Sequence, residues 1–371
     1  MLVLRIVTVA SATGRYGGPF DTATRQVALL RRRGHAATVV AGAFENDEPD
    51  SDVLVARRVR HLFGGLSFFD VGSLRFLGLL WSRVPSADVV HVSFAREIVP
   101  LWATLIARLT RTPAVLQPHG MLTSRSSFVH RVFDAFITRA VIPGRATVLA
   151  LSERERAELE RWNPRLRGRI ATLGNPPPPG LQAITAERDG QPPVALFAAR
   201  LHPRKRVLDF AGAAAIAHER KWTESYSVLG PDEGELERLL RVAGSVPRLK
   251  YLGATDSAGV IEQLKESGVF VLPAEKEPWG NVVVAAIKLG IPVVITRSSV
   301  LAQVIEESGA GRVVEDGSPE AIAEAVHAIL DRENYRGFVR RARALADSTF
   351  DEEDHARELE ALYLRTRGEV Q

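Results

Sequence analysis

Residues 271–294 read VLPAEKEPWGNVVVAAIKLGIPVV. Apolar, β-branched runs stand at both ends of this stretch, and such runs are typical of buried strands in a parallel sheet. Between them lie a polar loop, AEKEPWG, and an apolar segment of helical length, NVVVAAIKLG. The order strand, loop, helix, strand predicts one unit of a parallel α/β sheet.

The same alternation runs through the second half of the chain. Helical stretches such as ELERLLRVAG, AGVIEQLKESG and PEAIAEAVHAILDREN separate the apolar runs. We expect strands at 194–200, 225–230, 248–253, 269–274, 291–297 and 311–314. Short strands alternating with helices predict a doubly wound parallel sheet.

The first half begins with a similar unit. An apolar run (3–10), a glycine-rich loop (SATGRYGGP), an amphipathic segment (21–35) and a second apolar run (36–42) follow one another. This order predicts a βαβ unit. Further strands are expected at 88–94, 113–120 and 146–152, followed by a helix at 152–162 that Ser152 caps.

A proline-rich segment, GNPPPPGLQAITAERDGQPP (174–193), interrupts this pattern. Consecutive prolines donate no backbone hydrogen bonds, so we place a stiff connection here. The predicted organisation is an N-terminal Rossmann-like domain (1–175), a linker (176–193), a C-terminal Rossmann-like domain (194–348) and a helix (349–371) that returns toward the N-terminal domain. Two such sheets are expected to face a central cleft, because ligands bind at the carboxyl edges of open α/β sheets.

Composition narrows the class of protein. The 371 residues include no cysteine, which excludes disulfides and thiolate metal sites. The opening MLVLRIVTVASATG has no basic n-region, so we interpret it as a core strand and not as a signal peptide. No run of about 18 apolar residues exists. We therefore expect a cytoplasmic protein, with peripheral attachment to the inner face of the membrane as an option.

Charge is unevenly distributed along the chain. Residues 1–180 hold 24 Lys and Arg against 14 Asp and Glu, or +10, whereas residues 181–371 hold 24 against 30, or −6. A basic first half suggests an anionic partner, either nucleic acid or anionic lipid, or else only an arginine-rich surface. The apolar segments 61–84 and 125–145 are open to two interpretations: core helices, or helices at a membrane surface that face a lipid-linked acceptor.

Two cations mark a candidate site in FAARLHPRKRV (197–207). Arg200 stands at the end of an expected strand, and Lys205 follows in the turn before a helix. Cations at the carboxyl edge of a sheet can neutralise a diphosphate, although a solvated basic turn has the same composition. GPDEG (230–234) suits a tight turn and is a weak signal by itself.

Together these pieces resemble a known family. The pattern R-L-x-P-x-K, then G-P-x-E-G, then P-x-x-x-E-P-W-G with A-x-x-x-G-x-P-V-V is similar to the retaining glycosyltransferases of family 4. GGPFDTATRQVALLRRRGHAATVV, DVVHVS, QPHGML and LALSERE fall in the family's order, and QPHGML resembles members that build exopolysaccharide and capsule. The resemblance covers essentially the whole chain and implies the two-domain GT-B fold.

The resemblance also implies roles for particular residues. Arg200 and Lys205 would hold the diphosphate of a nucleoside-diphosphate sugar, and Glu277 would bond hydroxyls of the transferred sugar. His119 would lie against that sugar, making these four the expected catalytic residues. The expected donor-binding residues are Gly17, Gly18, Gly230, Trp279, Gly280, Asn281, Val282 and Ala285. No metal and no cofactor other than the donor substrate are implied.

Ala285 departs from the family pattern. The family has a second glutamate eight positions after the first, and this glutamate binds the ribose hydroxyls; here that position holds Ala285. The loss of one charge-assisted contact weakens binding by roughly 1.5–3 kcal/mol. Three explanations stay open: another side chain binds the ribose, the nucleotide is unusual, or the protein has lost activity.

Plainer interpretations compete at several positions. His91 alternates with apolar residues and is expected to be packed in the sheet. Gly17 and Gly18 need only form a turn, because no full G-x-G-x-x-G is present. Trp279 is expected to anchor its loop, and Glu277 can cap the helix that follows it. His119 ends a strand before a glycine, which favours a position in the cleft.

The expected function is transfer of a hexose, with retention of configuration, from a nucleotide sugar to a cell-surface glycan or lipid-linked acceptor. The departing diphosphate gains negative charge, which fixed cations and a helix N-terminus stabilise. The alternatives are a non-catalytic GT-B subunit, motivated by Ala285, and a sugar-nucleotide epimerase. A nucleic-acid-binding protein is disfavoured because no reading motif or aromatic platform is found.

Overall fold

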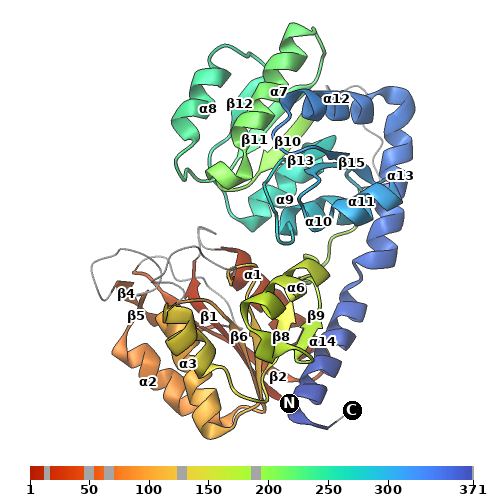
Figure 1. Cartoon of the computed structure of the whole chain (residues 1–371). Helices are drawn as coiled ribbons and strands as arrows, with labels where there is room; N and C mark the ends of the chain where they lie inside the picture. Colours follow the sequence, from red (N-terminus) through yellow and green to blue (C-terminus); the bar gives the residue numbers. More distant parts are fainter. Residues whose placement is uncertain (12–16, 46–53, 62–70, 123–131, 185–193, 370–371) are drawn as a thin grey trace. The chain divides into compact units, whose positions relative to one another are not determined.

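The computed structural model describes residues 1–11, 17–45, 54–61, 71–122, 132–184 and 194–369. The chain divides into two compact units (Figure 1). Unit 1 comprises Met1–Pro176 and Glu352–Gln371, and unit 2 comprises Pro177–Asp351. The last half of the proline-rich segment, 185–193, lies outside the described residues.

Unit 1 is built on a parallel sheet of seven strands. In spatial order they are β3 (Leu54–Arg58), β2 (Ala36–Ala43), β1 (Leu2–Ala10), β6 (Val89–Ser93), β7 (Ala114–Gln117), β8 (Thr147–Ala150) and β9 (Ile170–Thr172). A short antiparallel pair, β4 (Arg60–His61) and β5 (Val71–Gly72), lies beside it.

Both faces of this sheet are buried. Successive side chains of β1 enter opposite clusters: Leu4 and Ile6 join one, and Val3 and Val7 join the other. This explains why β1 reads as a continuous apolar run. The helical segments are α1 (Gly17–Arg32), α2 (Leu74–Arg83), η2 (Val84–Ser86), α3 (Ile98–Thr110), η3 (Asp134–Thr138), α5 (Arg139–Val141), α6 (Glu153–Trp162), η4 (Pro164–Leu166) and α14 (Glu352–Arg367).

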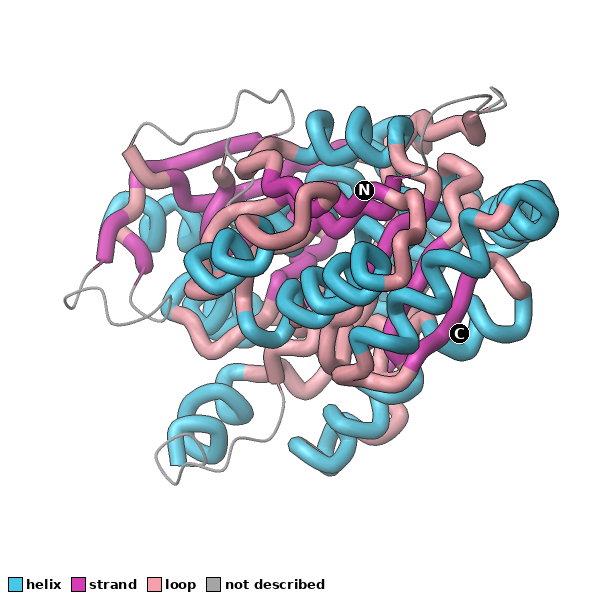
Figure 2. The backbone as a smooth tube through the Cα atoms, turned by 90° about the horizontal axis from the view of Figure 1, so that it is seen from above, coloured by secondary structure: helices cyan, strands magenta, loops and turns pink. Residues whose placement is uncertain are grey.

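Unit 2 is built on a parallel sheet of six strands. In spatial order they are β12 (Leu249–Tyr251), β11 (Ser225–Leu229), β10 (Val194–Ala198), β13 (Val269–Leu272), β14 (Val293–Thr296) and β15 (Gly311–Val314). Figure 2 shows the same backbone from above, with helices and strands in different colours. The helical segments are η5 (Pro203–Lys205), α7 (Val207–Glu219), α8 (Leu236–Ala243), α9 (Ser257–Glu266), α10 (Asn281–Lys288), α11 (Ala302–Ser308), α12 (Pro319–Leu330) and α13 (Arg332–Thr349).

Both sheets are doubly wound, as the sequence predicts. Strand order runs outward from β1 in unit 1 and from β10 in unit 2, and it reverses at the pairs β1–β6 and β10–β13. In open α/β sheets, ligands bind beyond the carboxyl ends of the strands at this switch point. A ligand site of unit 2 is therefore expected at the loops after β10 and β13.

The C-terminal helix α14 packs on unit 1. The Tyr363 hydroxyl and His91 Nδ1 lie 2.7 Å apart inside the protein, and Glu360 accepts from Arg33 and His35. Acidic residues occupy the first turn of α14 and basic residues the last, which complements the helix dipole.

Some predicted boundaries differ from the structure. The predicted helical stretch 319–334 is two helices, because Asp331 ends α12 and caps α13 through the Glu333 N–H. The predicted strand 113–120 stops at Gln117, because His119 and Gly120 have positive φ. Helix α1 begins at Gly17, four residues before the predicted amphipathic segment.

The two ambiguous apolar segments fall partly outside the described residues, which omit 62–70 and 123–131. Within the rest, Phe76 and Leu80 of α2 are buried, whereas Leu74 and Trp81 are exposed. No helix in the described part of the chain is long and apolar enough to cross a membrane.

Candidate functional site: a charged cluster at the switch point of unit 2

Lys205 and Glu277 meet on the two loops that flank the switch point of unit 2. Lys205 ends η5, the turn after β10, and Glu277 lies in the loop after β13. The Lys205 ammonium and the Glu277 carboxylate form an ion pair and hydrogen bond. Their side chains are 22% and 10% exposed, so the pair is largely shielded from water.

Neighbouring loops hold the Glu277 loop in place. The Glu275 N–H donates to the Arg204 carbonyl at 2.8 Å, and the Lys276 N–H donates to Ser298 Oγ at 2.8 Å. The Glu277 carbonyl accepts from the Val300 N–H at 3.1 Å. These bonds attach the polar loop AEKEPWG to η5 through Arg204 and to the segment after β14 through Ser298 and Val300.

Arg200 points to a different carboxylate. Its Nη1 lies 2.7 and 3.0 Å from the two carboxylate oxygens of Glu233, which belongs to the loop after β11. Arg200 is 52% exposed and Glu233 is 29% exposed. The two predicted diphosphate-binding cations therefore each bond a different acidic residue, and only Lys205 bonds Glu277.

Helix α10 begins beside Glu277. Gly280 caps this helix with φ of 80°, a left-handed conformation that favours glycine. The first N–H groups of a helix lack intrahelical acceptors, and Asn281 and Val282 occupy these positions. The start of α10 thus carries the partial positive charge of a helix N-terminus where the sequence predicts a phosphate.

Trp279 and Ala285 face the protein interior. The Trp279 ring packs edge-on against Phe350 with 6.5 Å between ring centroids, so its predicted role as a loop anchor is confirmed. Ala285 is 3% exposed and lies in the hydrophobic core of unit 2. Its methyl group presents no polar atom to a ribose.

Gly230 is required by the backbone. Its φ is 142°, and a Cβ built there would lie 1.9 Å from the Ala199 carbonyl oxygen. The close approach brings the loop after β11 against the loop that carries Arg200. Tyr251 supports this contact by donating its hydroxyl to the Gly230 carbonyl at 2.9 Å.

Unit 1 holds the remaining predicted residues. Gly17 and Gly18 form the first turn of α1, and a Cβ at Gly18 would meet no atom within 4 Å. His119 follows β7, is partly buried and has φ of 53°. Burial and the nearby positive charge of Arg5 hold the pKa of His119 well below its usual range. His91 is fully buried, which confirms it as a packed sheet histidine.

Sequence analysis did not identify several residues that bond the predicted site residues or the loops that carry them. Glu233 was visible only as part of the weak GPDEG signal, and Ser298 stands in a stretch without a motif. Arg5, buried in β1, is hidden in an apolar run. Their partners lie far along the chain, so local pattern carries no sign of them.

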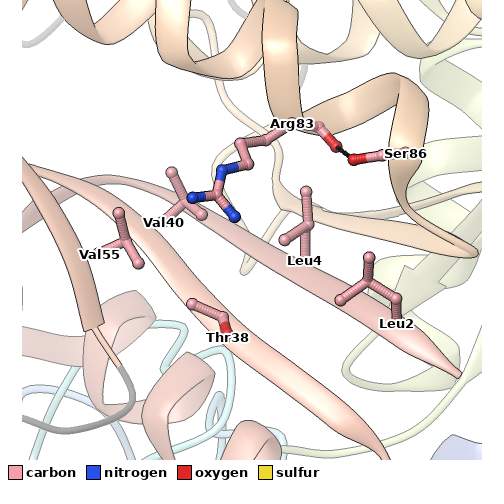
Figure 3. Close-up of a pocket in the computed structure, with 7 residues that line it drawn as sticks. All are labelled: Leu2, Leu4, Thr38, Val40, Val55, Arg83 and Ser86. Carbon is pink, nitrogen blue, oxygen red and sulfur yellow. Dashed lines mark hydrogen bonds between the residues drawn. The ribbon is translucent and has the colours of Figure 1, made fainter.

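The pocket in Figure 3 lies elsewhere, at the start of β1. Leu2, Leu4, Val40 and Val55 line it together with Arg83, and no predicted site residue contributes. Among the described residues, no group of three or more His, Asp or Glu side chains could hold a metal ion.

Comparisons with known proteins define the class. Residues 17–176 match the Glycosyl transferase 4-like domain, and residues 184–344 match Glycosyl transferases group 1. The structure of Anabaena HepE in complex with UDP and glucose superposes with a TM-score of 0.74 at 17% identity, over 97% of this chain and 98% of that one. The fold is therefore GT-B, and the class is glycosyltransferase.

Curated relatives agree with this class. A GDP-mannose-dependent alpha-mannosyltransferase of Mycobacterium tuberculosis is 25% identical over 92% of both chains. D-inositol 3-phosphate glycosyltransferase 2 of Catenulispora acidiphila is 29% identical over 52% of this chain and 49% of that enzyme, so this match spans about half of the relative. The chain belongs to glycosyltransferase family 4.

Proposed function

We propose that this chain transfers a hexose from a nucleoside-diphosphate sugar to a cell-surface glycan or lipid-linked acceptor, with retention of configuration and without a metal. The observation that carries the proposal is the Lys205–Glu277 pair at the switch point of unit 2. The Lys205 ammonium suits a diphosphate and the Glu277 carboxylate suits sugar hydroxyls, and the two groups are in direct contact. The HepE complex with UDP and glucose and the GDP-mannose-dependent relative support a nucleotide-sugar donor.

The chemistry follows from these charges. The bond from the sugar C1 to the diphosphate oxygen breaks, and its electron pair stays on that oxygen. The acceptor hydroxyl oxygen bonds to C1 on the same face, and its proton passes to the departing diphosphate. Lys205 and Arg200 stabilise the negative charge that develops, while Glu277 orients the sugar by accepting from its hydroxyls. His119 is proposed to donate a hydrogen bond to a substrate oxygen.

Metal independence rests on the same cations. Side-chain ammonium and guanidinium groups supply the positive charge at the departing phosphate that a divalent cation supplies in other enzymes. Turnover should therefore be unchanged in excess EDTA. A loss of turnover that Mg²⁺ or Mn²⁺ restores would overturn this part of the proposal.

The experiment has two stages. A thermal-shift screen of the pure chain over UDP- and GDP-hexoses identifies the donor, because ligand binding raises apparent stability by mass action. Transfer is then measured with that donor, and NMR reads the anomeric configuration of the product. An inverted product would exclude retention, and label exchange at a ring carbon without transfer would identify an epimerase.

A non-catalytic subunit is the second candidate, and Ala285 favours it. At the position that the resemblance assigns to ribose binding, this chain has the buried methyl side chain of Ala285. The variant Ala285→Glu separates the two functions. Tighter donor binding by the variant indicates a weakened ribose site, whereas no binding by either form, with both forms folded, supports the non-catalytic subunit.

We propose that an apolar surface of unit 1 contacts the membrane that carries the acceptor. It consists of Leu74 and Trp81 on α2, Leu109 on α3 and Phe136 on η3, which are 87, 51, 62 and 77% exposed. Helices α2 and α3 pack together through the rings of Trp81 and Trp102, 6.0 Å apart. Exposed arginines lie on these elements or directly after them: Arg75 and Arg83 on α2, Arg108 on α3, and Arg139 at the start of α5, which follows η3.

Large exposed apolar side chains with neighbouring cations suit an interface rich in anionic lipid. The chain should sediment with vesicles of anionic phosphatidylglycerol and much less with phosphatidylcholine. Trp81→Ser combined with Phe136→Ser should abolish this binding and leave donor binding unchanged. Equal sedimentation of the double variant would show that this surface is not the contact.

A further inference from the structure

Arg5 is a buried cation that has no acidic partner in the described part of the chain. Its side chain is fully buried in β1 and bonds neutral groups only. Burial lowers its pKa to about 10, so the guanidinium is still charged at neutral pH. Neutral acceptors satisfy it instead: Gln26 Oε1 at 2.7 Å, Gln117 Oε1 at 3.0 Å and the His91 carbonyl at 3.1 Å. Burying a charge away from water is energetically unfavourable, so a functional role for Arg5 is worth considering.

Arg5 also reaches His119, a residue 114 positions away in the chain. Its Nη2 lies 3.4 Å from His119 Nε2, and Ser93 Oγ lies 3.2 Å from the same nitrogen. A guanidinium has only donors, so it can bond this nitrogen only if the nitrogen accepts. The hydrogen of a neutral imidazole must then reside on Nδ1.

The backbone around His119 is fixed as well. His119 and Gly120 have consecutive positive φ values of 53° and 75°. The Glu155 carboxylate accepts from the Gly120 N–H at 2.6 Å and from the Leu151 N–H at 2.7 Å. This carboxylate ties the loop to the start of α6, so the ring has a defined position and a defined contact at Nε2.

We infer that Arg5 is a positioning residue that holds His119 as the neutral imidazole with its hydrogen on Nδ1. The Nδ1–H is then the group that donates to a substrate oxygen; this last step rests on the proposed function. No hydrogen-bond partner for Nδ1 is found among the described residues. The titratable groups around this ring are Arg5 on β1, His91 on β6 and Glu155 on α6, with Tyr363 of α14 bonded to His91.

The test reads the ring itself and needs no substrate. NMR of the full chain labelled with ¹⁵N-histidine distinguishes the two tautomers and follows the charge on His119. We expect the Nδ1–H form, neutral throughout pH 5.5–8. Arg5→Met should raise the pKa of His119 toward its usual value of about 6.5 and mix the tautomers. Arg5→Lys keeps the charge and should keep the pKa low. An Nε2–H ring in the wild type would overturn the inference.

A matched control separates positioning from general damage. Arg169→Gln removes a partly buried arginine of the same unit that bonds the carbonyls of Pro143 and Ala146, and it should leave the His119 signals unchanged. If Arg5→Met does not fold, Arg5→Lys is compared with Ser93→Ala, which removes the other group near Nε2. A tautomer that changes in Ser93→Ala and not in Arg5→Lys would overturn the inference. A wild-type Nδ1–H ring in a chain that transfers no sugar would refute the proposed function and leave this inference intact.

Discussion

Lys205 and Glu277, 72 residues apart in the chain, form an ion pair that joins the loops after β10 and β13. The carboxylate accepts one of the three hydrogen bonds that the ammonium can donate. A bound diphosphate would offer the ammonium a second, more highly charged partner. The pair therefore links the loops after the two strands that flank the switch point and fixes the ammonium where we propose that the diphosphate binds.

Lys205→Ala should reduce turnover by about 10²- to 10³-fold, the usual effect of removing one group that stabilises developing negative charge. The fold should survive, because the ammonium lies at a loop and not in the core. Single-turnover transfer from a saturating donor measures the effect. Lys276→Ala is the matched control, because Lys276 is 64% exposed and its ammonium pairs only loosely, at 3.6 Å, with Glu275. Equal losses in both variants would contradict the role given to Lys205.

Glu233→Gln should tighten donor binding. The Glu233 carboxylate occupies Arg200, so a donor phosphate must compete with it for the guanidinium. Exposed ion pairs are worth up to about 1 kcal/mol, so the gain should not exceed about fivefold. Isothermal titration with the donor measures it. In Arg200→Ala the same substitution should have no effect, and an undiminished gain there would show that Glu233 acts in another way.

Gly230→Ala should destabilise unit 2 by more than about 3 kcal/mol, because the new methyl group would overlap the Ala199 carbonyl and φ is positive. Urea unfolding measures the change. Gly244→Ala is the control: its φ is −62° and its Cβ would lie at least 3.5 Å from any atom. That substitution should change stability by less than about 1 kcal/mol. Similar losses at both positions would show that close approach is not the cause.

Tyr363→Phe should destabilise unit 1 by about 1–3 kcal/mol. The hydroxyl bonds His91 Nδ1 at 2.7 Å, and both side chains are fully buried, so the imidazole nitrogen would lose its partner. Thermal unfolding compares this variant with Tyr251→Phe, whose hydroxyl is partly buried and bonds one carbonyl. The Tyr251 variant should lose less. A neutral Tyr363 variant would show that apolar packing alone holds α14.

Sequence pattern predicted the strands of unit 2 well. The central strands β10, β13 and β14 are short apolar runs buried on both faces, which is the clearest signal of a parallel strand. Sequence pattern also placed Glu277 and Gly280 in one loop, because both residues belong to the short contiguous stretch AEKEPWG between a strand and a helix. It did not reveal the break at Asp331, because the residues on both sides continue a helical pattern. A single capping carboxylate decides that boundary.

The residues that bond the predicted site residues could not be predicted from sequence pattern, for a different reason. Arg5 finds Gln117 and His119 only after parallel strands bring residues more than 100 positions apart into contact. A lone arginine in an apolar run predicts no partner. Glu233 and Ser298 likewise gain their contacts from strand order and not from neighbours in the chain.

Glu97 stands at the switch point of unit 1. It follows β6, occupies the N-cap position of α3 without a side-chain capping bond, and accepts a hydrogen bond from Thr8 of β1. Burial raises the pKa of Glu97 from 4.5 to about 7, against the opposing effect of the Thr8 hydroxyl. The folded protein therefore binds a proton at this carboxyl more tightly than the unfolded chain does. Stability should fall as the pH rises from 4.5 to 7, because the folded state must then hold a buried charge.

Glu97→Gln should remove this dependence, because an amide does not ionise. Near pH 4.5 the variant and the wild type should have nearly equal unfolding free energies. Above pH 7 the variant should be more stable, by at most about 3 kcal/mol. Thr8→Val is the opposite change: it removes a bond that favours the carboxylate, so the pKa of Glu97 should rise further and the pH dependence should steepen. Urea titrations from pH 4.5 to 8 measure the unfolding free energies of all three proteins. If the difference between Glu97→Gln and wild type stays constant with pH, this carboxyl is not the titrating group.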